Sequence, residues 1–600
     1  FRQRFADPRS DLGMMQGSTG PQLLAMSLPV RRRGVVLLSP ASALAGRGRA
    51  SVSTFGPAPP RSIHDSSPLA PRRSEAQDVH GKASPFGVSA AIAAAAALGA
   101  AAATGAARCD GLPPLEPKSE VELSNWSGTH QVVTQSMFSP ATLEELEALV
   151  AWASRSRKKL RPIGSNMSPN GIAMNETGML STALLDKVLS VDLDAQTITV
   201  QAGTRISTIL NELQKHGLTL ANFGSVREQQ IAGWTQTSAH GTGARIPTVD
   251  ELIVGMKLVT PGRGTLELKP SGPTAKLFRL ARVGLGALGV VAEVTLACVP
   301  TFRLHERTYV TNVQDLRANH ARMLQTHRHV RYMWVPYTDT VVVVASNIAK
   351  EGAVAQPALP ESERVKPLLD LLRELDPEGA ASCAGDYTQL RERLLQMDPV
   401  NPEHVARVNR AEAEFWRLSA GERLGDSTDI LGFECGGPQW VLENCFHCGT
   451  LEQPTYMDLD HLEELMHMIE RERIPAVSPI EQRWTSRSTS PMSPAYSENP
   501  ADIFSWVGVI MYITPEQKAD AIKEQFRAYA MKFADLTFKY DGVFHWAKVD
   551  LDFHRGHGRL ADLRHQLQRR FDLAGFQKQR QWLDPCNMFG NRLTDVALRL

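Results

Sequence analysis

The sequence predicts an α+β protein in which a first mixed domain is followed by a second domain with its own sheet. Residues 139–156, SPATLEELEALVAWASRS, keep apolar residues at helical spacing after a Ser-Pro start and lead into the strand-like KKLRPIG. LSVDL (189–193) and TITVQAG (197–203) alternate as strands do, and a helix is expected over 206–216. After Pro300, the runs YVTNV, HVRYMWVPY and DTVVVVAS indicate strands of a new sheet.

Composition and charge limit the class of protein. The chain has 600 residues, of which 42% are hydrophobic and 22% charged, as is typical of a globular protein with several domains. Residues 1–85 carry 11 Arg and 1 Lys against 5 acids, a net charge of 12 − 5 = +7. The whole chain has +1, which leaves 1 − 7 = −6 for the remainder. The body therefore lacks the basic excess that nucleic-acid binding requires.

The N-terminal region has the composition of a targeting segment. No acid occurs from Leu12 to His64, whereas Arg, Ser and Ala accumulate, which predicts a transit peptide over 1–85. A mitochondrial address is favoured, and the chloroplast is the alternative. The uncharged Ala- and Gly-rich run at 86–107 predicts, within a segment 86–115, either a sorting or stop-transfer element or a flexible linker.

The body divides into a first domain over 116–302 and a second over 303–600. Within the second, residues 351–429 are charged and mostly helical, which suggests an insertion with a solvated face rather than a site. Further strands are expected over 504–514 and 542–549, and Asp584-Pro585-Cys586-Asn587 is expected to end the organised part.

Two glycine-containing turns are candidates for binding a phosphate group. RPIGSNMSPNG (161–171) offers backbone N–H groups that can cradle a diphosphate without a basic side chain, and TSAHGTGA (237–244) could do the same. For each, an ordinary turn is the alternative. GLGALG (284–289) matches GxGxxG, but the strand-like VVAEVTLACV follows instead of a helix, so a glycine turn into a strand is a better description than a dinucleotide fingerprint.

Charged residues near the C-terminal half are candidates for catalysis. Glu481 and Arg483 lie two apart in PIEQRWTSRS, so in a strand both side chains face one side and could orient a hydroxyl and a developing oxyanion. A surface ion pair is the alternative. In FHWAK, Lys548 could add a second cation, while His545 would point to the opposite face of a regular strand. A core histidine and a solvated lysine are the alternatives there.

The seven cysteines are few and irregularly spaced, which argues against a disulfide framework. Cys445 and Cys448 form a single CxxC without a second pair, so free thiols are favoured over zinc or redox use, and no metal site is predicted. Cys435 is either an oxidation-sensitive thiol or a small hydrophobic residue of the interior.

The motifs taken together resemble a known family. NFGSVREQQIAG (222–233), AHGTGARIP, GLGALGVVAEVTL, PIEQRWTSRS, FHWAK and DPCNMFGN are similar to the aldonolactone oxidoreductases of the vanillyl-alcohol-oxidase flavoprotein family. The resemblance runs from about Asn125 to Asn591. It implies a two-subdomain PCMH-type FAD-binding domain over 116–302 and a substrate (cap) domain with an antiparallel sheet.

The cofactor implied by the resemblance is FAD. Many relatives carry, at the position of Met167, a histidine joined covalently to the flavin; a thioether cannot form that bond, so non-covalent FAD is expected. The residues expected to bind FAD are Pro162, Ile163, Gly164, Ser165, Asn166, Met167, Ser168, Gly224, Ser225, Gly233, Ser238, His240, Gly241, Thr242, Gly289, Val291 and His545.

The implied reaction is the oxidation of L-galactono-1,4-lactone at C2 to a 2-keto lactone that tautomerises to ascorbate. Glu481 would orient or accept from the hydroxyl, Arg483 and Lys548 would stabilise developing negative charge, and Ser225 would contact the substrate. Cytochrome c is the implied electron acceptor, on the inner membrane or intermembrane-space side of the mitochondrion. An aldonolactone oxidase that uses O₂ is one alternative, and a role in complex I assembly is another.

One residue departs from the family pattern. The plant dehydrogenases of this family carry Ala, close to the flavin carbon that oxygen attacks, where this chain has Gly224. The missing methyl group would open space for O₂, which is the basis of the oxidase alternative. Closure of that space by neighbouring side chains is the opposing interpretation.

Overall fold

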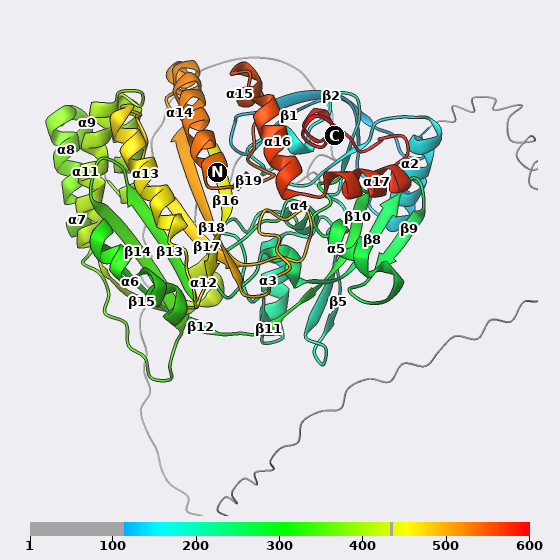
Figure 1. Ribbon diagram of the computed structural model, residues 1–600, viewed down its shortest axis with the longest axis horizontal. Helices are drawn as coiled ribbons and strands as arrows, with labels where there is room; N and C mark the ends of the chain where they lie inside the picture. Colours follow the sequence, from blue (N-terminus) through cyan, green and yellow to red (C-terminus); the bar gives the residue numbers. More distant parts are fainter. Residues whose placement is uncertain (1–112, 384, 433–435, 600) are drawn as a thin grey trace, which may run out of the picture. The chain divides into compact units, whose positions relative to one another are not determined.

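The computed structural model describes residues 113–383, 385–432 and 436–599. The predicted transit peptide, nearly all of the Ala-rich segment and Cys435 lie outside these residues. The described chain forms a four-stranded, a five-stranded and a two-stranded sheet from its first half and one eight-stranded sheet from its second (Figure 1). The predicted α+β class is confirmed. No helix in these ranges has the length and apolar character needed to cross a membrane.

The first sheet combines antiparallel and parallel pairing in the order β1-β2-β4-β3. Its strands are β1 (Lys118–Ser124), β2 (Gln131–Phe138), β3 (Arg161–Ile163) and β4 (Met179–Ser181). Helix α2 (Leu143–Arg155) connects β2 to β3, and its N-cap is Thr142, whose side chain accepts from the backbone N–H of Glu145. The helix therefore begins later than the Ser-Pro start that the sequence suggests.

The second sheet is antiparallel in the order β5-β6-β10-β8-β9. Its strands are β5 (Val188–Asp192), β6 (Thr197–Gln201), β8 (Ile253–Thr260), β9 (Gly264–Leu268) and β10 (Val290–Ala297). The glycine turn at 284–289 leads directly into β10, as predicted, so it opens no helix. The same half contains α3 (Ile206–Lys215), α4 (Ile231–Gln236), α5 (Ala275–Ala281) and the short pair β7 (Leu218–Thr219) and β11 (Val299–Pro300).

The third sheet is antiparallel in the order β15-β12-β14-β13-β17-β18-β16-β19. Its strands are β12 (Arg303–Thr311), β13 (His329–Val335), β14 (Thr340–Ile348), β15 (Gly421–Asp426), β16 (Gln439–Thr450), β17 (Ile480–Ser486), β18 (Asp502–Tyr512) and β19 (Val543–Phe544). Helices α6 (Val313–Thr326), α13 (Met457–Arg471) and α14 (Ala519–Lys539) pack against its strands. The segment expected as a strand over 542–549 keeps only the two residues of β19 in the ladder.

The predicted insertion is helical. It contains α7 (Glu361–Arg364), α8 (Lys366–Leu375), α9 (Pro377–Ser382), α10 (Tyr387–Met397) and α11 (Pro402–Leu418), and α12 (Ser427–Leu431) follows β15. Leu368, Leu372, Leu390 and Leu394 share one apolar cluster with Phe415, so these helices have a core of their own. Helix α11 also packs against β12 and β13.

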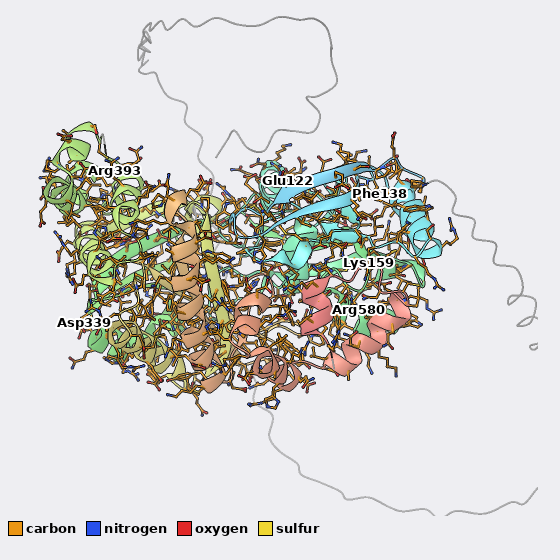
Figure 2. All side chains as sticks on the ribbon, turned by 90° about the horizontal axis from the view of Figure 1, so that it is seen from above. Glu122, Phe138, Lys159, Asp339, Arg393 and Arg580 are labelled. Atoms are coloured by element: carbon orange, nitrogen blue, oxygen red, sulfur yellow. The ribbon has the colours of Figure 1, made fainter. Side chains whose placement is uncertain are left out.

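The C-terminal helices return to the first half of the chain. They are α15 (Leu551–Gly556), α16 (Leu560–Arg570), α17 (Leu573–Leu583) and α18 (Arg592–Ala597), so order continues beyond the Asp584–Asn587 stretch expected to end it. Met588 and Phe589 pack among residues of α2 and β10. Figure 2 shows Arg580 near Lys159, whose ammonium donates to the carbonyl of Asn587 at 2.7 Å.

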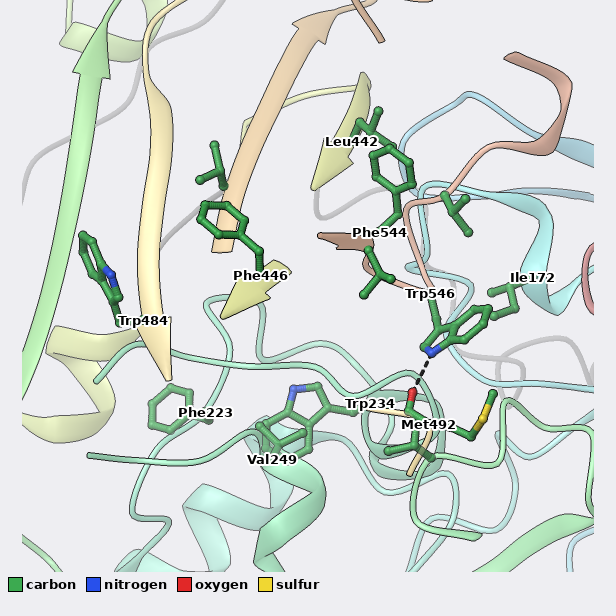
Figure 3. Close-up of a cluster of buried hydrophobic side chains, with 14 of the residues drawn as sticks. Ile172, Phe223, Trp234, Val249, Leu442, Phe446, Trp484, Met492, Phe544 and Trp546 are labelled. Atoms are coloured by element: carbon green, nitrogen blue, oxygen red, sulfur yellow. Dashed lines mark hydrogen bonds between the residues drawn. The ribbon is translucent and has the colours of Figure 1, made fainter. Parts of the chain in front are cut away.

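One apolar core runs through both halves. Phe223 and Trp234 of the first half belong to the same buried cluster as Phe446 and Trp484 of the second (Figure 3). The indole of Trp546 lies in this cluster and donates to the carbonyl of Met492 at 2.7 Å. Burial of this much apolar surface fixes the two halves against each other and therefore fixes the walls of any site between them.

Arg161 joins three segments from inside the protein. Its side chain is 2% exposed and donates to the carbonyls of Ile172, Leu285, Gly286 and Phe589 at 2.8–3.1 Å. Burial lowers the pKa of Arg161 to about 9, so the guanidinium is still charged at neutral pH. All of the hydrogen bonds of this guanidinium go to backbone carbonyls. The loop that follows Arg161 therefore has backbone N–H groups, rather than this side chain, for binding a ligand.

We expect Arg161→Met to lower the free energy of unfolding by about 3 kcal/mol, because it leaves several buried carbonyls without a donor. Urea denaturation of the full chain measures this. Arg155→Met removes an exposed guanidinium at the end of α2 and should change the free energy by less than about 0.5 kcal/mol. Equal, small losses in both variants would contradict the structural role of Arg161.

Candidate active site

A cavity of about 550 Å³ lies where the two halves meet. From the first half it is lined by the turn at 161–169, parts of the segment 224–240 and the turn at 285–291. From the second half it is lined by side chains of β13, β16, β17 and β18, by residues 545–548 and by the insertion. A cavity of this size can enclose a large organic cofactor or ligand.

The turn after β3 presents backbone donors to this cavity. Asn166 adopts a left-handed conformation (φ 53°). The Nδ2 atom of Asn166 donates to the carbonyl of Ser124 at 3.1 Å, which fixes the turn to the end of β1. The backbone N–H groups of residues 165–168 donate to no oxygen among the described residues. Backbone N–H groups without partners in a turn can form a concave anion site of the kind that a diphosphate needs.

Two buried polar atoms at the cavity wall support the same interpretation. The Oδ1 atom of Asn166 and the indole Nε1 of Trp234 are buried and have no hydrogen-bond partner in the described part of the chain. Both atoms are therefore candidates for a hydrogen bond to a polar ligand in the cavity. The residues present therefore fit a bound dinucleotide.

Glu481 and Arg483 lie on the same face of β17, as predicted from their spacing, and both line the cavity. The Nε atom of Arg483 lies 3.2 Å from Oε2 of Glu481. Arg331 of β13 lies opposite Arg483 in the ladder, and its Nη1 is 3.5 Å from Oε1 of Glu481. The Glu481 carboxylate thus lies between two guanidinium groups and is 24% exposed.

Lys548 and His545 both line the cavity, contrary to the expectation that they face opposite sides. The expectation failed because the segment leaves the sheet after β19 and turns. The N–H of His545 donates to the carbonyl of Glu443, and the N–H of Lys548 donates back to the carbonyl of His545, each at 2.9 Å. Asn170 holds the turn from the first half by donating to the carbonyls of Trp546 and Val549 at 2.9 and 2.8 Å.

Glu443 on β16 is a buried carboxylate that sequence reasoning missed. It is 2% exposed; its Oε1 accepts from Nη2 of Arg483 at 3.0 Å, and its Oε2 accepts from Nζ of Lys548 at 2.6 Å and Nε2 of His240 at 3.1 Å. A glutamate within the otherwise largely apolar run QWVLENCF was the available signal. Burial alone would raise the pKa of Glu443, but the charges of Lys548 and Arg483 and the hydrogen bond from His240 hold it well below its ordinary value.

The two histidines of the site are buried and neutral. Burial lowers the pKa of His240, and it lowers that of His545 well below its ordinary range. The neutral ring of His240 has one proton, and the Glu443 carboxylate is a stronger acceptor for it than the carbonyl of Gly241 at 3.1 Å. His240, Glu443 and His545 offer ligand atoms within 4.8 Å of one another, but both Glu443 oxygens already accept from cationic side chains, which assigns the cluster to charge balance.

The charged side chains form a chain of alternating sign. Arg331, Glu481, Arg483, Glu443 and Lys548 follow one another with contacts of 2.6–3.5 Å. Three cations and two carboxylates give this group a net charge of +1 when all are ionised. An excess positive charge beside a cofactor cavity favours a ligand or a reaction in which negative charge develops.

The insertion contributes to the cavity wall, which differs from the solvated surface expected for it. Tyr387, Thr388, Arg391 and Trp416 line the cavity. Arg391 is held by Glu412, whose Oε2 lies 3.0 Å from its Nε, and by the hydroxyl of Tyr512 at 3.1 Å. The mixed charge of this segment gave no sign of these buried pairs, because they depend on how α10 and α11 pack against each other.

Most, but not all, of the residues expected to bind FAD line the cavity. Ser238, Gly241 and Thr242 do not line it, whereas Thr237, Ala239 and His240 of the same TSAHGTGA turn do. Ser238 contacts the buried Asp250 at 2.9 Å, and Thr242 donates to the carbonyl of Val330. Gly241 is pressed against Asn222, so its role is close packing behind the wall.

Cys445 and Cys448 are buried free thiols on β16, and burial raises the pKa of both well above the ordinary value. The described chain therefore keeps them as inert thiols of the core, as the sequence favoured.

Comparisons with known proteins agree with the fold and the cavity. A family profile described as "FAD binding domain" matches residues 134–268, and one described as "D-arabinono-1,4-lactone oxidase" matches 294–597. Cholesterol oxidase from Brevibacterium sterolicum covers 82% of this chain and 99% of its own with a TM-score of 0.63 at 16% identity, which shows a shared fold. The fold and site thus define an FAD-dependent oxidoreductase.

Relatives with higher identity narrow the family. The mitochondrial L-galactono-1,4-lactone dehydrogenase of Brassica oleracea is 46% identical over 494 residues, which cover 79% of this chain and 82% of the relative. The Arabidopsis thaliana enzyme of the same name is 45% identical, covering 79% and 80%. L-gulonolactone oxidase of Bos taurus is 27% identical, covering 72% and 89%. The chain belongs to the L-galactono-1,4-lactone dehydrogenase family of aldonolactone oxidoreductases, and its cofactor is FAD.

We expect Gly233→Leu to remove FAD while stabilising the apoprotein. Gly233 lies in α4, faces the cavity, and has no atom within 4 Å of the position of an added Cβ. Leucine would occupy cofactor space yet favour the helix by about 0.8 kcal/mol. The absorbance ratio at flavin and protein wavelengths, an FAD fluorescence titration and apoprotein melting measure both effects.

Gln214→Leu, which places the same side chain on an exposed position of α3, is the matched control and should retain FAD. Full FAD occupancy in Gly233→Leu would show that α4 does not face the cofactor.

Proposed function

We propose that this protein oxidises L-galactono-1,4-lactone at C2 to the 2-keto lactone, which tautomerises to ascorbate. The observation that carries the proposal is the convergence of Glu481, Arg483 and Lys548 on the cavity that also contains the backbone-donor turn. The relatives at 45–46% identity are named for this substrate. FAD, when bound, supplies the acceptor for the hydride that leaves C2.

The side chains of this protein are proposed to accept the proton of the C2 hydroxyl and to stabilise the negative charge on its oxygen. The hydroxyl at C2 must lose its proton as the hydride departs, and Glu481 is the proposed acceptor because its carboxylate faces the cavity and keeps contact with solvent. Arg483 and Lys548 stabilise the negative charge that develops on the oxygen. Ser225, which also lines the cavity, is proposed to orient the substrate.

FAD is proposed to be held without a covalent bond. Met167 lies in the backbone-donor turn and lines the cavity. A thioether cannot form a histidyl-type link to the flavin, so affinity depends on the backbone donors of residues 165–168 and on the cavity walls. The residues that line the cavity and are proposed to contact FAD are Pro162, Ile163, Gly164, Ser165, Asn166, Met167, Ser168, Gly224, Ser225, Gly233, His240, Gly289, Val291 and His545.

Cytochrome c in the mitochondrion is the proposed electron acceptor. The relatives are named mitochondrial, and residues 1–85 have the Arg-rich, acid-poor composition of a transit peptide. The net charge of −6 on the remainder suits a basic electron carrier. A position on the inner membrane or intermembrane-space side follows from that acceptor, and an association with complex I assembly intermediates stays a prediction from the resemblance.

We expect Glu481→Gln to lower kcat by about 100-fold or more with FAD retained, because the variant lacks the proton acceptor. The assay is anaerobic reduction of cytochrome c with L-galactono-1,4-lactone. Glu422→Gln changes a carboxylate of the edge strand β15 that pairs with His305, and should keep wild-type turnover. Wild-type kcat in Glu481→Gln would remove Glu481 from the mechanism, and an inactive wild type would refute the substrate.

A second candidate function, lactone oxidation by O₂, is favoured by Gly224. An added Cβ would lie 3.4 Å from the carbonyl of His240 and 3.5 Å from Nε1 of Trp234, which are ordinary contacts. The position therefore has room for the methyl group that the plant relatives are expected to carry, and neighbouring side chains do not fill it.

We expect Gly224→Ala to lower the rate of O₂ consumption at least about 10-fold while cytochrome c reduction changes less than about 2-fold, a difference of roughly 1 kcal/mol or more between the two acceptors. Parallel assays with O₂ alone and with cytochrome c under nitrogen measure the two rates. Negligible peroxide formation by the wild type would settle the choice against the oxidase.

A further inference from the structure

We propose that Glu443 is a positioning residue for the proposed lactone oxidation: its buried carboxylate holds the Lys548 ammonium and the Arg483 guanidinium at fixed places and neutralises one of their charges. The inference rests on the proposed function for its catalytic consequence. It goes beyond that function because Glu443 is assigned no role by the reaction itself.

The contacts of Glu443 gather groups from three segments of the chain. Lys548 comes from the turn after β19, Arg483 from β17, and His240 from the first half of the protein, and all three donate to the same carboxylate at 2.6–3.1 Å. His240 is itself fixed by stacking on Trp506, with ring centroids 3.8 Å apart and an angle of 17°. A shift of the carboxylate would therefore release both candidate cations together.

The sheet leaves room for this arrangement at one residue. Strand β18 lies between β16 and β17, and Gly508 is the ladder partner of both Glu443 and Glu481. An added Cβ at Gly508 would lie 3.7 Å from Oε1 of Glu443, and a longer side chain would fill the space over which Arg483 reaches Glu443. The absent side chain thus permits an ion pair between strands that are not neighbours.

Electrostatics explains why a carboxylate is needed. The buried Arg483 and the partly buried Lys548 would repel each other without a counter-ion, and each would bear an uncompensated cost of desolvation. Arg331 adds a third positive charge on the far side of Glu481. The titratable groups that face Glu443 are Arg483, Lys548, His240, His545 and Glu481, and loss of the carboxylate would make every cationic form among them less favourable.

Two variants separate charge from position. Glu443→Gln keeps the shape of the side chain and removes its charge, while Glu443→Asp keeps the charge and withdraws it by one methylene. We expect Glu443→Gln to lower kcat about 100-fold with KM changed less than about 5-fold, because the displaced cations act on charge that develops only during the reaction. We expect Glu443→Asp to lower kcat about 10-fold.

Two further measurements do not depend on turnover alone. The pH above which kcat falls should be lower by about one unit in Glu443→Gln. The reason is that the cationic side chains of the site lose the carboxylate that serves as their counter-ion. The midpoint potential of bound FAD should rise, because the net charge of the site changes from +1 to +2 by loss of one carboxylate and reduction adds negative charge. A lower kcat together with a higher potential is the expected signature.

Asp458→Asn is the matched control. Asp458 is also a buried carboxylate of the second half that accepts from a histidine Nε2, that of His320 at 2.9 Å, and from the indole of Trp484, but it does not line the cavity. We expect this variant to lose stability while its kcat, pH profile and flavin potential stay at wild-type values.

The outcomes distinguish the two proposals. If Glu443→Gln and Asp458→Asn both lose only stability, Glu443 is a structural residue and the inference is overturned. If the wild type does not oxidise the lactone but Glu443→Gln still raises the flavin potential, the substrate is wrong and the charge role of Glu443 stands. An unchanged potential in folded, FAD-loaded Glu443→Gln overturns the charge role whatever the substrate.

Discussion

The geometry of the site depends on the buried carboxylate of Glu443. Cations that stabilise developing negative charge must be dry to be effective, yet dry cations repel each other and resist burial. A single carboxylate at 2% exposure meets both demands, because it accepts from Arg483, Lys548 and His240 at once. Its partners come from both halves of the chain, so these ion pairs and hydrogen bonds also link the two halves.

The two halves divide the chemical work. The first half supplies backbone N–H groups at the turn after β3, which bind by position and need no charged side chain. The second half supplies the charged side chains on β13, β16 and β17. The backbone donors and the charged side chains are both needed for the site. The shared apolar core and the C-terminal segment that returns to the first half hold these two groups at fixed positions relative to each other. Arg161, at 2% exposure, performs the same task from within the first half.

The fold alone does not specify the substrate. A bacterial cholesterol oxidase shares the fold at 16% identity, and a fold of this kind hosts different substrates according to the side chains that face its cavity. In this chain those side chains include an alternating row of three cations and two carboxylates, and the insertion helices that close part of the wall with Tyr387 and Arg391.

The sequence by itself determined the features that depend on near neighbours in the chain. The element types, the turn from GLGALG into β10, and the shared face of Glu481 and Arg483 follow from local periodicity, and the long motifs of the resemblance indicated FAD. Only the tertiary structure decided the contacts of Glu443, Arg331 and the insertion, and the places of Ser238, Gly241 and Thr242 behind the cavity wall. The reason is distance along the chain: Glu443 meets Arg483 and Lys548 across 40 and 105 residues, and no local pattern encodes which buried charge will meet which.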